Sequence, residues 1–282
     1  MIDNLVHMDK VLRAALEEDI GAGDITTDAI IAPDFKGKAA LVTRERIVLA
    51  GLPVFERVFK LLDPMIEIED YYTDGQVAPA GVKICLLAGS LSVILKAERT
   101  ALNFIQRMSG IATLTREYVR KAGSEKVKVL DTRKTAPGLR SFDKYAVRMG
   151  GGFNHRFGLY DAILIKDNHI SAVGSMTKAV RLAKKKASKN IKVEVEVEHP
   201  DRVEEAIMAG ADSILLDNMS LDQIREAVRI AAGRIPLEVS GGVNLENINE
   251  IARTGIDFIS VGALTHSVRA VDLSLELLPQ TG

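Results

Sequence analysis

Many basic side chains, the following eight among them, gather between residues 131 and 170, in a stretch that links two apolar segments and contains three consecutive glycines at 150–152. These eight are Arg133, Lys134, Arg140, Lys144, Arg148, His155, Arg156 and Lys166. A planar guanidinium can bind two oxygens of a carboxylate or phosphate at once, and glycine lets backbone amides approach an anion closely. The stretch therefore predicts an anion-binding site. The alternative is a solvated basic loop.

Carboxylates alternate with valines in the segment KVEVEVEH, residues 192–199. In a strand, the valines would share one face, toward helices, and the glutamates would share the other, toward the interior of a barrel or its mouth. Like charges there need cations or a metal. Asp217 ends the apolar segment ILLDN and is a second carboxylate, so Glu196 and Asp217 predict a Mg²⁺ site. The alternative is an exposed edge strand with its glutamates in water.

Two glycine turns follow the last apolar segments, SGGV at 240–243 and VGAL at 261–264. In many barrels such late turns hold a phosphate with backbone amides and a helix N-terminus. Ser240, Gly241, Gly262 and His266 are the candidate residues. The predicted site thus combines cations, paired carboxylates and glycine turns, in this order along the chain. This combination predicts polyanionic substrates, one of them carrying pyrophosphate.

A parallel sheet would position these side chains, because ligands of parallel α/β folds bind outside the carboxyl ends of the strands. Apolar segments predict strands at 126–132, 161–167, 191–198, 213–218, 236–241 and 258–263. Helical patterns lie between them at 142–149, 176–189, 200–209, 221–232 and 245–253. A closed eight-stranded barrel takes about 250 residues, so this barrel is expected to be short or incomplete. Its open mouth would have to be covered, either by the N-terminal domain or by another subunit, and on that ground we predict a homodimer.

The first part of the chain has a different pattern, typical of an α+β domain. A helix is predicted at 9–20, strands at 38–50, 65–72 and 83–96, and a short helix at 54–62. Residues 98–122 predict a linking helix with one interruption at Ser109 and Gly110.

Composition excludes several classes of protein. The 282 residues are 47% hydrophobic, and 37 basic residues balance 38 acidic ones for a net charge of −1, which argues against general attraction to nucleic acid or membranes. Cys85 is the single cysteine, so no internal disulfide is expected. It lies in an apolar segment, which predicts a position in the core. The first twenty residues lack a long apolar run, so neither a signal peptide nor a membrane span is expected, and a cytoplasmic location is the default.

Taken together, the motifs are similar to those of the quinolinate phosphoribosyltransferase family, also called carboxylating nicotinate-nucleotide pyrophosphorylases. The matching segments are EEDIGAGDITT, AERTALNFIQRMSGIAT, DTRKTAPGLR, GGGFNHRFGLYDAILIKDNHI, EVEVE, ILLDN, SGG and VGALTHS. They cover nearly the whole chain in order. The resemblance implies a mixed N-terminal domain at 1–112, rejoined by the C-terminal tail 268–282, and an incomplete α/β barrel phosphoribosyltransferase domain at 113–267.

The resemblance also assigns roles to residues. It implies that quinolinate binds Arg133, His155, Arg156 and Lys166, together with Arg99 contributed across the dimer interface. Lys134 would contact phosphoribosyl pyrophosphate, Glu196 and Asp217 would be the acids linked to Mg²⁺, and Ser240, Gly241, Gly262 and His266 would lie in the 5-phosphate cradle. Lys134, Glu196 and Asp217 are the predicted catalytic residues. No binding role is predicted for Arg140, Lys144 and Arg148, which we expect to be structural or surface residues.

The implied reaction joins quinolinate to phosphoribosyl pyrophosphate and yields nicotinate mononucleotide, pyrophosphate and carbon dioxide, in NAD biosynthesis. Three alternatives stay open. One is a relative with the same fold and another acceptor, such as nicotinate or the base of the molybdenum-associated relatives, although five cations favour a dicarboxylate. Another is an aldolase with Lys166 as a Schiff-base lysine. The third is a non-catalytic barrel that binds anions without turnover.

Overall fold

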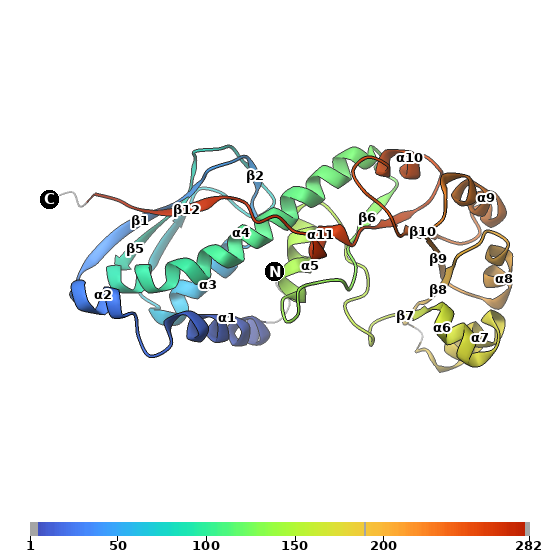
Figure 1. Ribbon diagram of the computed structural model, residues 1–282, viewed down its shortest axis with the longest axis horizontal. Helices are drawn as coiled ribbons and strands as arrows, with labels where there is room; N and C mark the ends of the chain where they lie inside the picture. The colour runs from blue at the N-terminus through green and yellow to red at the C-terminus, as the bar shows by residue number, and fades with distance from the viewer. Residues whose placement is uncertain (1–4, 189, 280–282) are drawn as a thin grey trace. The chain divides into compact units, whose positions relative to one another are not determined.

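The computed structural model describes residues 5–188 and 190–279, which belong to two compact units (Figure 1). The N-terminal unit comprises Met1–Arg116, Ala136–Gly151 and Val268–Gly282, and the barrel unit comprises Glu117–Thr135 and Gly152–Ser267. Residues 136–151 thus cluster with the N-terminal unit, although they lie between two strands of the barrel in the sequence.

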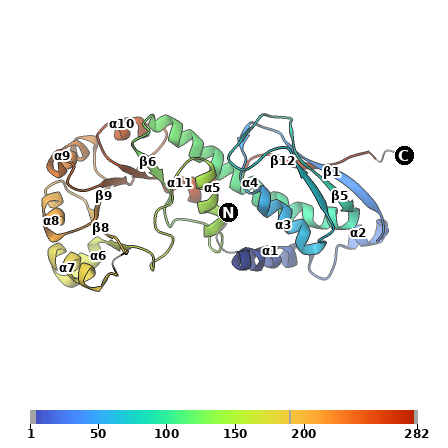
Figure 2. The same ribbon diagram turned by 180° about the vertical axis from the view of Figure 1, so that it is seen from behind.

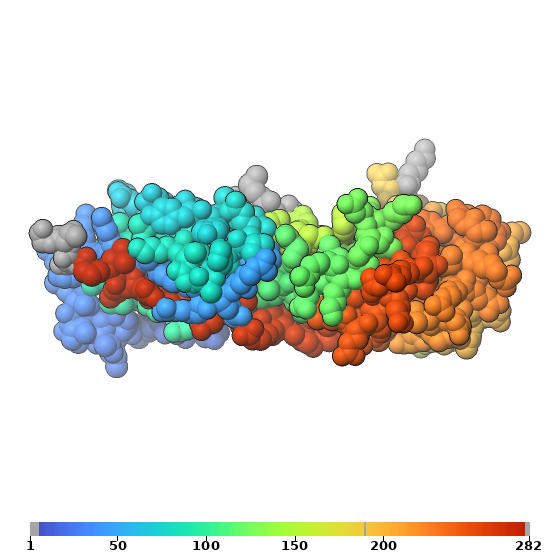
Figure 3. Space-filling view, turned by 90° about the horizontal axis from the view of Figure 1, so that it is seen from above, coloured from blue at the N-terminus to red at the C-terminus, as the bar shows by residue number. Residues whose placement is uncertain are grey.

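An antiparallel sheet with strand order β12-β1-β5-β3 forms the N-terminal unit. Its strands are β1 (Lys36–Thr43), β3 (Glu67–Asp70), β5 (Lys83–Ser90) and β12 (Leu273–Leu277), with the short pair β2 (Ile47–Val48) and β4 (Val77–Ala78) beside them. Its helices are α1 (Leu5–Ile20), α2 (Ile25–Ile30), α3 (Leu52–Leu62), α5 (Arg140–Met149) and the first part of α4 (Leu91–Ala122). The C-terminal strand β12 pairs with β1, and Figure 3 shows its red atoms against the blue atoms of this unit. Cys85 is buried in β5, in the core as expected.

Two expectations for this unit were wrong. The strand predicted at 83–96 ends at Ser90, where α4 begins, and α4 continues without a break through Ser109 and Gly110. Both residues serve packing. The Ser109 hydroxyl donates to the Ala50 carbonyl and accepts from the Ala50 amide, each at 3.1 Å. A Cβ on Gly110 would lie 2.2 Å from the carbonyl oxygen of Arg269, so glycine is needed there for the C-terminal segment to pass.

The barrel unit contains the six predicted strands, all parallel, in the order β6-β11-β10-β9-β8-β7 (Figures 1 and 2). They are β6 (Lys128–Leu130), β7 (Ile163–Ile165), β8 (Val193–Val197), β9 (Ser213–Asp217), β10 (Leu237–Ser240) and β11 (Phe258–Ser260). The predicted helices are present as α7 (Met176–Lys186), α8 (Arg202–Ala209), α9 (Leu221–Ala231) and α10 (Ile248–Ala252), and the short α6 (Asp167–Val173) and α11 (Ala263–His266) were not expected. Among the described strands β6 and β7 remain edges, which confirms an open rather than a closed barrel.

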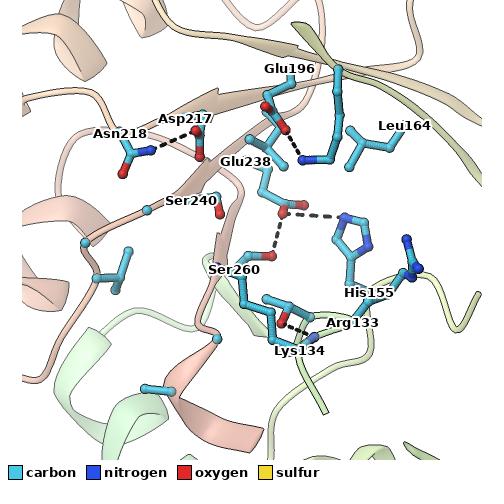
Figure 4. Close-up of a pocket in the computed structure, with 18 of the residues that line it drawn as sticks. Arg133, Lys134, His155, Leu164, Glu196, Asp217, Asn218, Glu238, Ser240 and Ser260 are labelled. Carbon is cyan, nitrogen blue, oxygen red and sulfur yellow. Dashed lines mark hydrogen bonds and ion pairs between the residues drawn. The ribbon is translucent and has the colours of Figure 1, made fainter. Parts of the chain in front are cut away.

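Strand β8 lies between β7 and β9, so the alternative of an exposed edge strand is wrong. Val193, Val195 and Val197 are buried, and α7 and α8 pack against the strand, as the alternation predicts. The intervening Glu194 and Glu196 are only partly buried, and Glu196 faces the inside of the open barrel (Figure 4). No helix in the described part of the chain has both the length and the apolar character to span a membrane.

We expect Gly110→Ala to destabilise the N-terminal unit by about 1–3 kcal/mol, because the added methyl overlaps the Arg269 carbonyl oxygen. At an uncrowded helix position the same change adds up to about 1 kcal/mol of stability. Urea unfolding of the two proteins measures the difference. A Gly110→Ala protein as stable as the wild type, or more stable, would contradict the close passage of the C-terminal segment.

Candidate active site

A pocket of about 620 Å³ lies at the carboxyl ends of the barrel strands (Figure 4). It is lined by every predicted site residue of the barrel unit: Arg133, Lys134, His155, Arg156, Lys166, Glu196, Asp217, Ser240, Gly241, Gly262 and His266. The other lining residues include Thr132, Leu164, Leu215, Asn218, Glu238, Gly242 and Ser260. Arg99 is exposed on α4 in the N-terminal unit and is not among them.

Asp131 holds the basic loop in place directly after β6. Its carboxylate is fully buried and accepts hydrogen bonds from the His155 backbone amide at 2.9 Å and from Asn154 Nδ2 at 2.6 Å. The Arg156 guanidinium donates to the Ala162 carbonyl at 3.1 Å. Burial, and then the charge of Arg133, lower the pKa of Arg156 from its ordinary value. Two neighbouring guanidinium groups in a pocket wall attract a dianion.

His155 connects this loop to the carboxylates inside the barrel. Its Nε2 lies 3.1 Å from Glu194 Oε2 and 3.6 Å from Glu238 Oε1. Glu194 also accepts from Ser213 Oγ at 3.0 Å, and Glu238 accepts from Ser260 Oγ. Burial, and then the charge of Glu194, raise the pKa of Glu238 to about 7. Glu194 is therefore paired with both a histidine and a serine, whereas, among the described residues, the hydrogen bond to Glu238 comes from Ser260 alone.

Lys166 and Glu196 both line the pocket and form an ion pair, with Nζ 2.7 Å from Oε2. The carboxylate side chain is 10% exposed and the lysine side chain 46%. From the sequence, Lys166 was predicted to bind the phosphoribosyl acceptor and Glu196 to bind a metal. The structure shows these two side chains in contact with each other. Lys166 thus has an ionic partner in the pocket, a role that the aldolase alternative does not assign to it.

Asp217 and Asn218 end β9 beside the first glycine turn. Asn218 has a left-handed backbone, with φ of 53°, and its Nδ2 donates to Asp217 Oδ2 at 2.8 Å. A Cβ on Gly241 would lie 2.1 Å from Asn218 Oδ1, and Gly241 has a φ of 90°. Both facts require glycine at 241. The turn thus places exposed backbone next to a carboxylate, which suits a phosphorylated ligand that carries a cation.

Lys134, Gly262 and His266 meet at the far end of the pocket. A Cβ on Gly262 would lie 3.0 Å from His266 Cδ2 and 3.3 Å from Lys134 Cδ. Thr265 Oγ1 donates to the Lys134 carbonyl at 2.8 Å, which ties α11 to the loop after β6. The sequence placed these residues in one site, and the structure brings them together from opposite ends of the barrel segment.

Sequence reasoning missed three residues of the site: Asp131, Glu238 and Ser260. Asp131 follows the apolar segment KVKVL, as Asp217 follows ILL, so its position at a strand end was a usable signal. Glu238 is a lone acid within the apolar strand segment PLEVS, which is itself unusual for a buried strand. Ser260 carries no comparable signal. Its role depends on β11 lying next to β10.

Comparison with known proteins adds the family. Residues 24–109 match the sequence model described as quinolinate phosphoribosyl transferase, N-terminal domain, and residues 111–276 match that of the C-terminal domain. The chain is 43% identical over 274 residues to the probable nicotinate-nucleotide pyrophosphorylase [carboxylating] of Bacillus subtilis, covering 97% of this chain and 94% of that one. It is 42% identical to the mitochondrial quinolinate phosphoribosyltransferase [decarboxylating] 2b of Nicotiana tabacum, covering 95% and 81%.

Solved structures give the same result. The crystal structure of NadC from Streptococcus pyogenes has a TM-score of 0.94 and 46% identity, with 98% of this chain and 99% of that chain covered. The nicotinate-nucleotide pyrophosphorylase of Francisella tularensis has a TM-score of 0.93 and 48% identity, with 99% of each chain covered. Human nicotinic acid phosphoribosyltransferase, at 14% identity and a TM-score of 0.57 over 96% and 74% of the chains, shares the fold alone.

The position of Asp131 generates a stability prediction. We expect Asp131→Asn to lower the free energy of unfolding by about 1.5–3 kcal/mol, because donors that include the His155 amide and Asn154 Nδ2 lose a charged acceptor in a fully buried place. Asp212→Asn is the matched control, since Asp212 also accepts from a backbone amide, that of Val193, but is partly exposed before β9. Urea unfolding measures both. Equal losses for the two variants would contradict the special role of Asp131.

Proposed function

Because the chain belongs to the quinolinate phosphoribosyltransferase family, we propose that its barrel pocket transfers phosphoribosyl from phosphoribosyl pyrophosphate to quinolinate. The products are nicotinate mononucleotide, pyrophosphate and carbon dioxide, and the reaction belongs to NAD biosynthesis. The single observation that carries the proposal is that one pocket is lined both by arginine and lysine side chains and by carboxylates and two glycine turns. The cations suit a dicarboxylate acceptor, and the carboxylates and glycine turns suit a pyrophosphate-bearing donor.

The acceptor subsite comprises Arg133, His155, Arg156 and Lys166. Quinolinate is planar and carries two adjacent carboxylates, and guanidinium groups bind such oxygens in pairs. Arg133 and Arg156 are close enough for the charge of one to lower the pKa of the other, so a dianion between them relieves their repulsion. Nicotinate has only one carboxylate and would leave part of this charge unbalanced. The cation count therefore favours quinolinate over a monocarboxylate acceptor.

The donor subsite comprises Lys134, Glu196, Asp217 and the two glycine turns. Ser240, Gly241, Gly262 and His266 are suited to the 5-phosphate, because glycine leaves room for the phosphate oxygens next to backbone. Glu196 and Asp217 present only oxygen ligands, the kind that Mg²⁺ prefers, and are the residues that would hold it. When bound, Mg²⁺ supplies charge neutralisation for pyrophosphate as it departs.

Electrostatics and positioning do most of the work in this mechanism. The arginines hold quinolinate by its carboxylates, so that its ring nitrogen is directed at the anomeric carbon of the ribose. As the bond to pyrophosphate breaks, the ribose gains positive charge, which the carboxylates of Glu196 and Asp217 stabilise. Lys134 offsets the negative charge on the donor phosphates. The positive ring nitrogen of the resulting nucleotide then stabilises the electron pair left when carbon dioxide departs.

Turnover tests the proposal directly. Protein incubated with quinolinate, phosphoribosyl pyrophosphate and Mg²⁺ is expected to form nicotinate mononucleotide, detected by chromatography and mass. Parallel reactions contain nicotinate in place of quinolinate. Product from nicotinate but not from quinolinate would contradict the acceptor assignment. Tight binding of both ligands without product would favour a non-catalytic barrel, and borohydride trapping of a carbonyl compound on Lys166 would favour an aldolase.

The two subsites predict different effects of substitution. Arg133→Ala and Arg156→Ala should each weaken quinolinate binding at least tenfold, since each removes a charged hydrogen-bond donor worth about 1.5–3 kcal/mol. Both should leave the affinity for phosphoribosyl pyrophosphate nearly unchanged, and Lys134→Ala should show the opposite pattern. Isothermal titration calorimetry with each ligand measures the affinities. Equal losses for both ligands in the arginine variants would contradict the division of the pocket.

A homodimer is part of the proposal, with Arg99 of each subunit reaching the acceptor subsite of the other. Arg99 is exposed on α4, and the Lys96–Asp28 ion pair at 2.5 Å ties the preceding turn of α4 to α2. Near this region the N-terminal unit exposes Ile25 (87%), Ile30 (73%) and Phe35 (43%), an apolar group that a second subunit would cover. We also propose a cytoplasmic location.

Mixing two inactive variants tests the shared site. Arg99→Ala and Lys134→Ala should each lose most activity alone, and subunit exchange should restore it, because a mixed dimer contains one intact site. The expected recovery is about one quarter of the wild-type activity when equal amounts mix at random. Native mass spectrometry of tagged subunits verifies the exchange. No recovery in proven mixed dimers would contradict the role of Arg99 across the interface.

A further inference from the structure

Glu238 is a buried acid in the pocket that phosphoribosyl transfer does not use. It projects from β10 into the barrel, is 3% exposed and lines the pocket (Figure 4). Its Oε1 accepts a hydrogen bond from Ser260 Oγ. Among the described residues no hydrogen-bond partner is found for Oε2. A carboxyl group in this position is either a costly unpaired charge or a neutral acid.

His155 lies closer to Glu194 than to Glu238. Its Nδ1 accepts from the Arg156 backbone amide at 2.8 Å, and its Nε2 faces Glu194 at 3.1 Å and Glu238 at 3.6 Å. Glu194 is the better satisfied carboxylate, because Ser213 also donates to it. Asp131 adds a second negative charge nearby.

The ionisable groups that face Glu238 are therefore Glu194 on β8, Asp131 after β6 and His155 on the basic loop. Ser260 on β11 is the remaining polar partner. Burial and the two carboxylates raise the pKa of Glu238 to about 7, whereas His155 and the Ser260 hydrogen bond act in the opposite direction. At neutral pH Glu238 thus carries its proton in a large share of the molecules.

The reaction requires such a proton. When carbon dioxide leaves, its former ring carbon must gain a hydrogen, and this carbon lies beside the ring nitrogen, inside the pocket. Arg133 and Arg156 do not give up protons at neutral pH, and the Lys166 ammonium is engaged by Glu196. A general acid is most efficient when its pKa lies near the working pH, and the pKa of Glu238 fits this requirement.

Resting on the proposed function, we propose that Glu238 donates the proton that replaces carbon dioxide on the pyridine ring. The bond between the ring carbon and the departing carboxylate breaks, and its electron pair stays on the ring carbon. That pair takes the proton from Glu238 Oε2, so a carbon–hydrogen bond forms and Glu238 becomes a carboxylate. Water returns a proton to Glu238 after the product leaves. No oxidant or reductant is needed.

The proposal fixes a direction of pH dependence. Glu238 must be protonated to act, so decarboxylation is fastest below a pH of about 7 and slows as the pH rises through that value. Phosphoribosyl transfer does not use this proton. Pyrophosphate release should therefore outpace carbon dioxide release in alkaline solution, and the intermediate quinolinate mononucleotide should accumulate.

Rapid-quench reactions that follow both products test the proposal. The full-length enzyme reacts with phosphoribosyl pyrophosphate, Mg²⁺ and quinolinate labelled in the carboxylate beside the ring nitrogen, and pyrophosphate and labelled carbon dioxide are measured together. Glu238→Gln keeps the size of the side chain and an acceptor for Ser260. We expect it to release pyrophosphate within about threefold of the wild-type rate, and carbon dioxide at least about a hundredfold more slowly.

Glu194→Gln is the matched control, because it changes the same buried group but leaves the proposed acid in place. The two products should stay coupled in this variant, and the alkaline fall in decarboxylation should shift to lower pH, since the pKa of Glu238 drops without the neighbouring charge. Uncoupling in Glu194→Gln equal to that in Glu238→Gln would overturn the proposal in favour of a structural role. Carbon dioxide that keeps pace with pyrophosphate in Glu238→Gln would overturn it as well.

The wild-type enzyme supplies a measurement that needs no variant. Its ratio of carbon dioxide to pyrophosphate in the first turnover, measured from pH 6 to pH 9, should fall about tenfold per unit above the pKa of Glu238. A ratio that stays constant over this range overturns the proposal even if Glu238→Gln fails to fold. Wild-type enzyme that releases neither product contradicts the proposed function itself, which separates the two failures.

Discussion

The alternation of valine and glutamate along β8 is the constraint on which the rest of the barrel unit depends. Helices cover the outer face of this strand, so the valines must face outward and the glutamates inward. An unpaired carboxylate inside a barrel costs several kcal/mol, so each inward glutamate needs a partner from another element. Glu194 pairs with His155 and accepts a hydrogen bond from Ser213, and Glu196 forms an ion pair with Lys166. The position of the basic loop is thus tied to the charges of the strand that it covers.

This balance of charge also prepares the pocket for catalysis. The same carboxylates that satisfy the fold hold the cations in fixed positions before any ligand arrives, which lowers the cost of ordering the site when substrates bind. Asp131 does the same for the backbone of the loop. The pairing leaves Glu238 with a hydroxyl donor, and burial, followed by the charge of Glu194, raises its pKa to about 7. The same network of carboxylates and their partners thus stabilises the fold and sets the properties of the pocket.

Much of the barrel unit could be predicted from the sequence, because each strand is a short apolar segment that ends in a polar residue. That rule located Lys166, Glu196, Asp217 and Ser240 at one edge of the sheet. The rule did not identify Glu238, because its place in the pocket depends on β10 lying between β9 and β11. Local sequence rules also predicted a break in α4 at Gly110. The glycine is there because Arg269, distant in the sequence, passes close to it, and not because the chain turns. The assignment of residues 136–151 to the N-terminal unit likewise rests on long-range packing.

The central claim is that Glu196, the inward carboxylate of β8 that lines the pocket, takes part in the chemistry, whereas the neighbouring Glu198 does not. Glu196 and Glu198 test it most directly, because they lie two residues apart and only Glu196 lines the pocket, while Glu198 is exposed after the strand ends. The measurement is kcat for nicotinate mononucleotide formation in Glu196→Gln and Glu198→Gln, with urea unfolding to verify the fold. The account predicts a loss of at least about a hundredfold for Glu196→Gln and wild-type activity for Glu198→Gln. Similar activities in the two folded variants would contradict it.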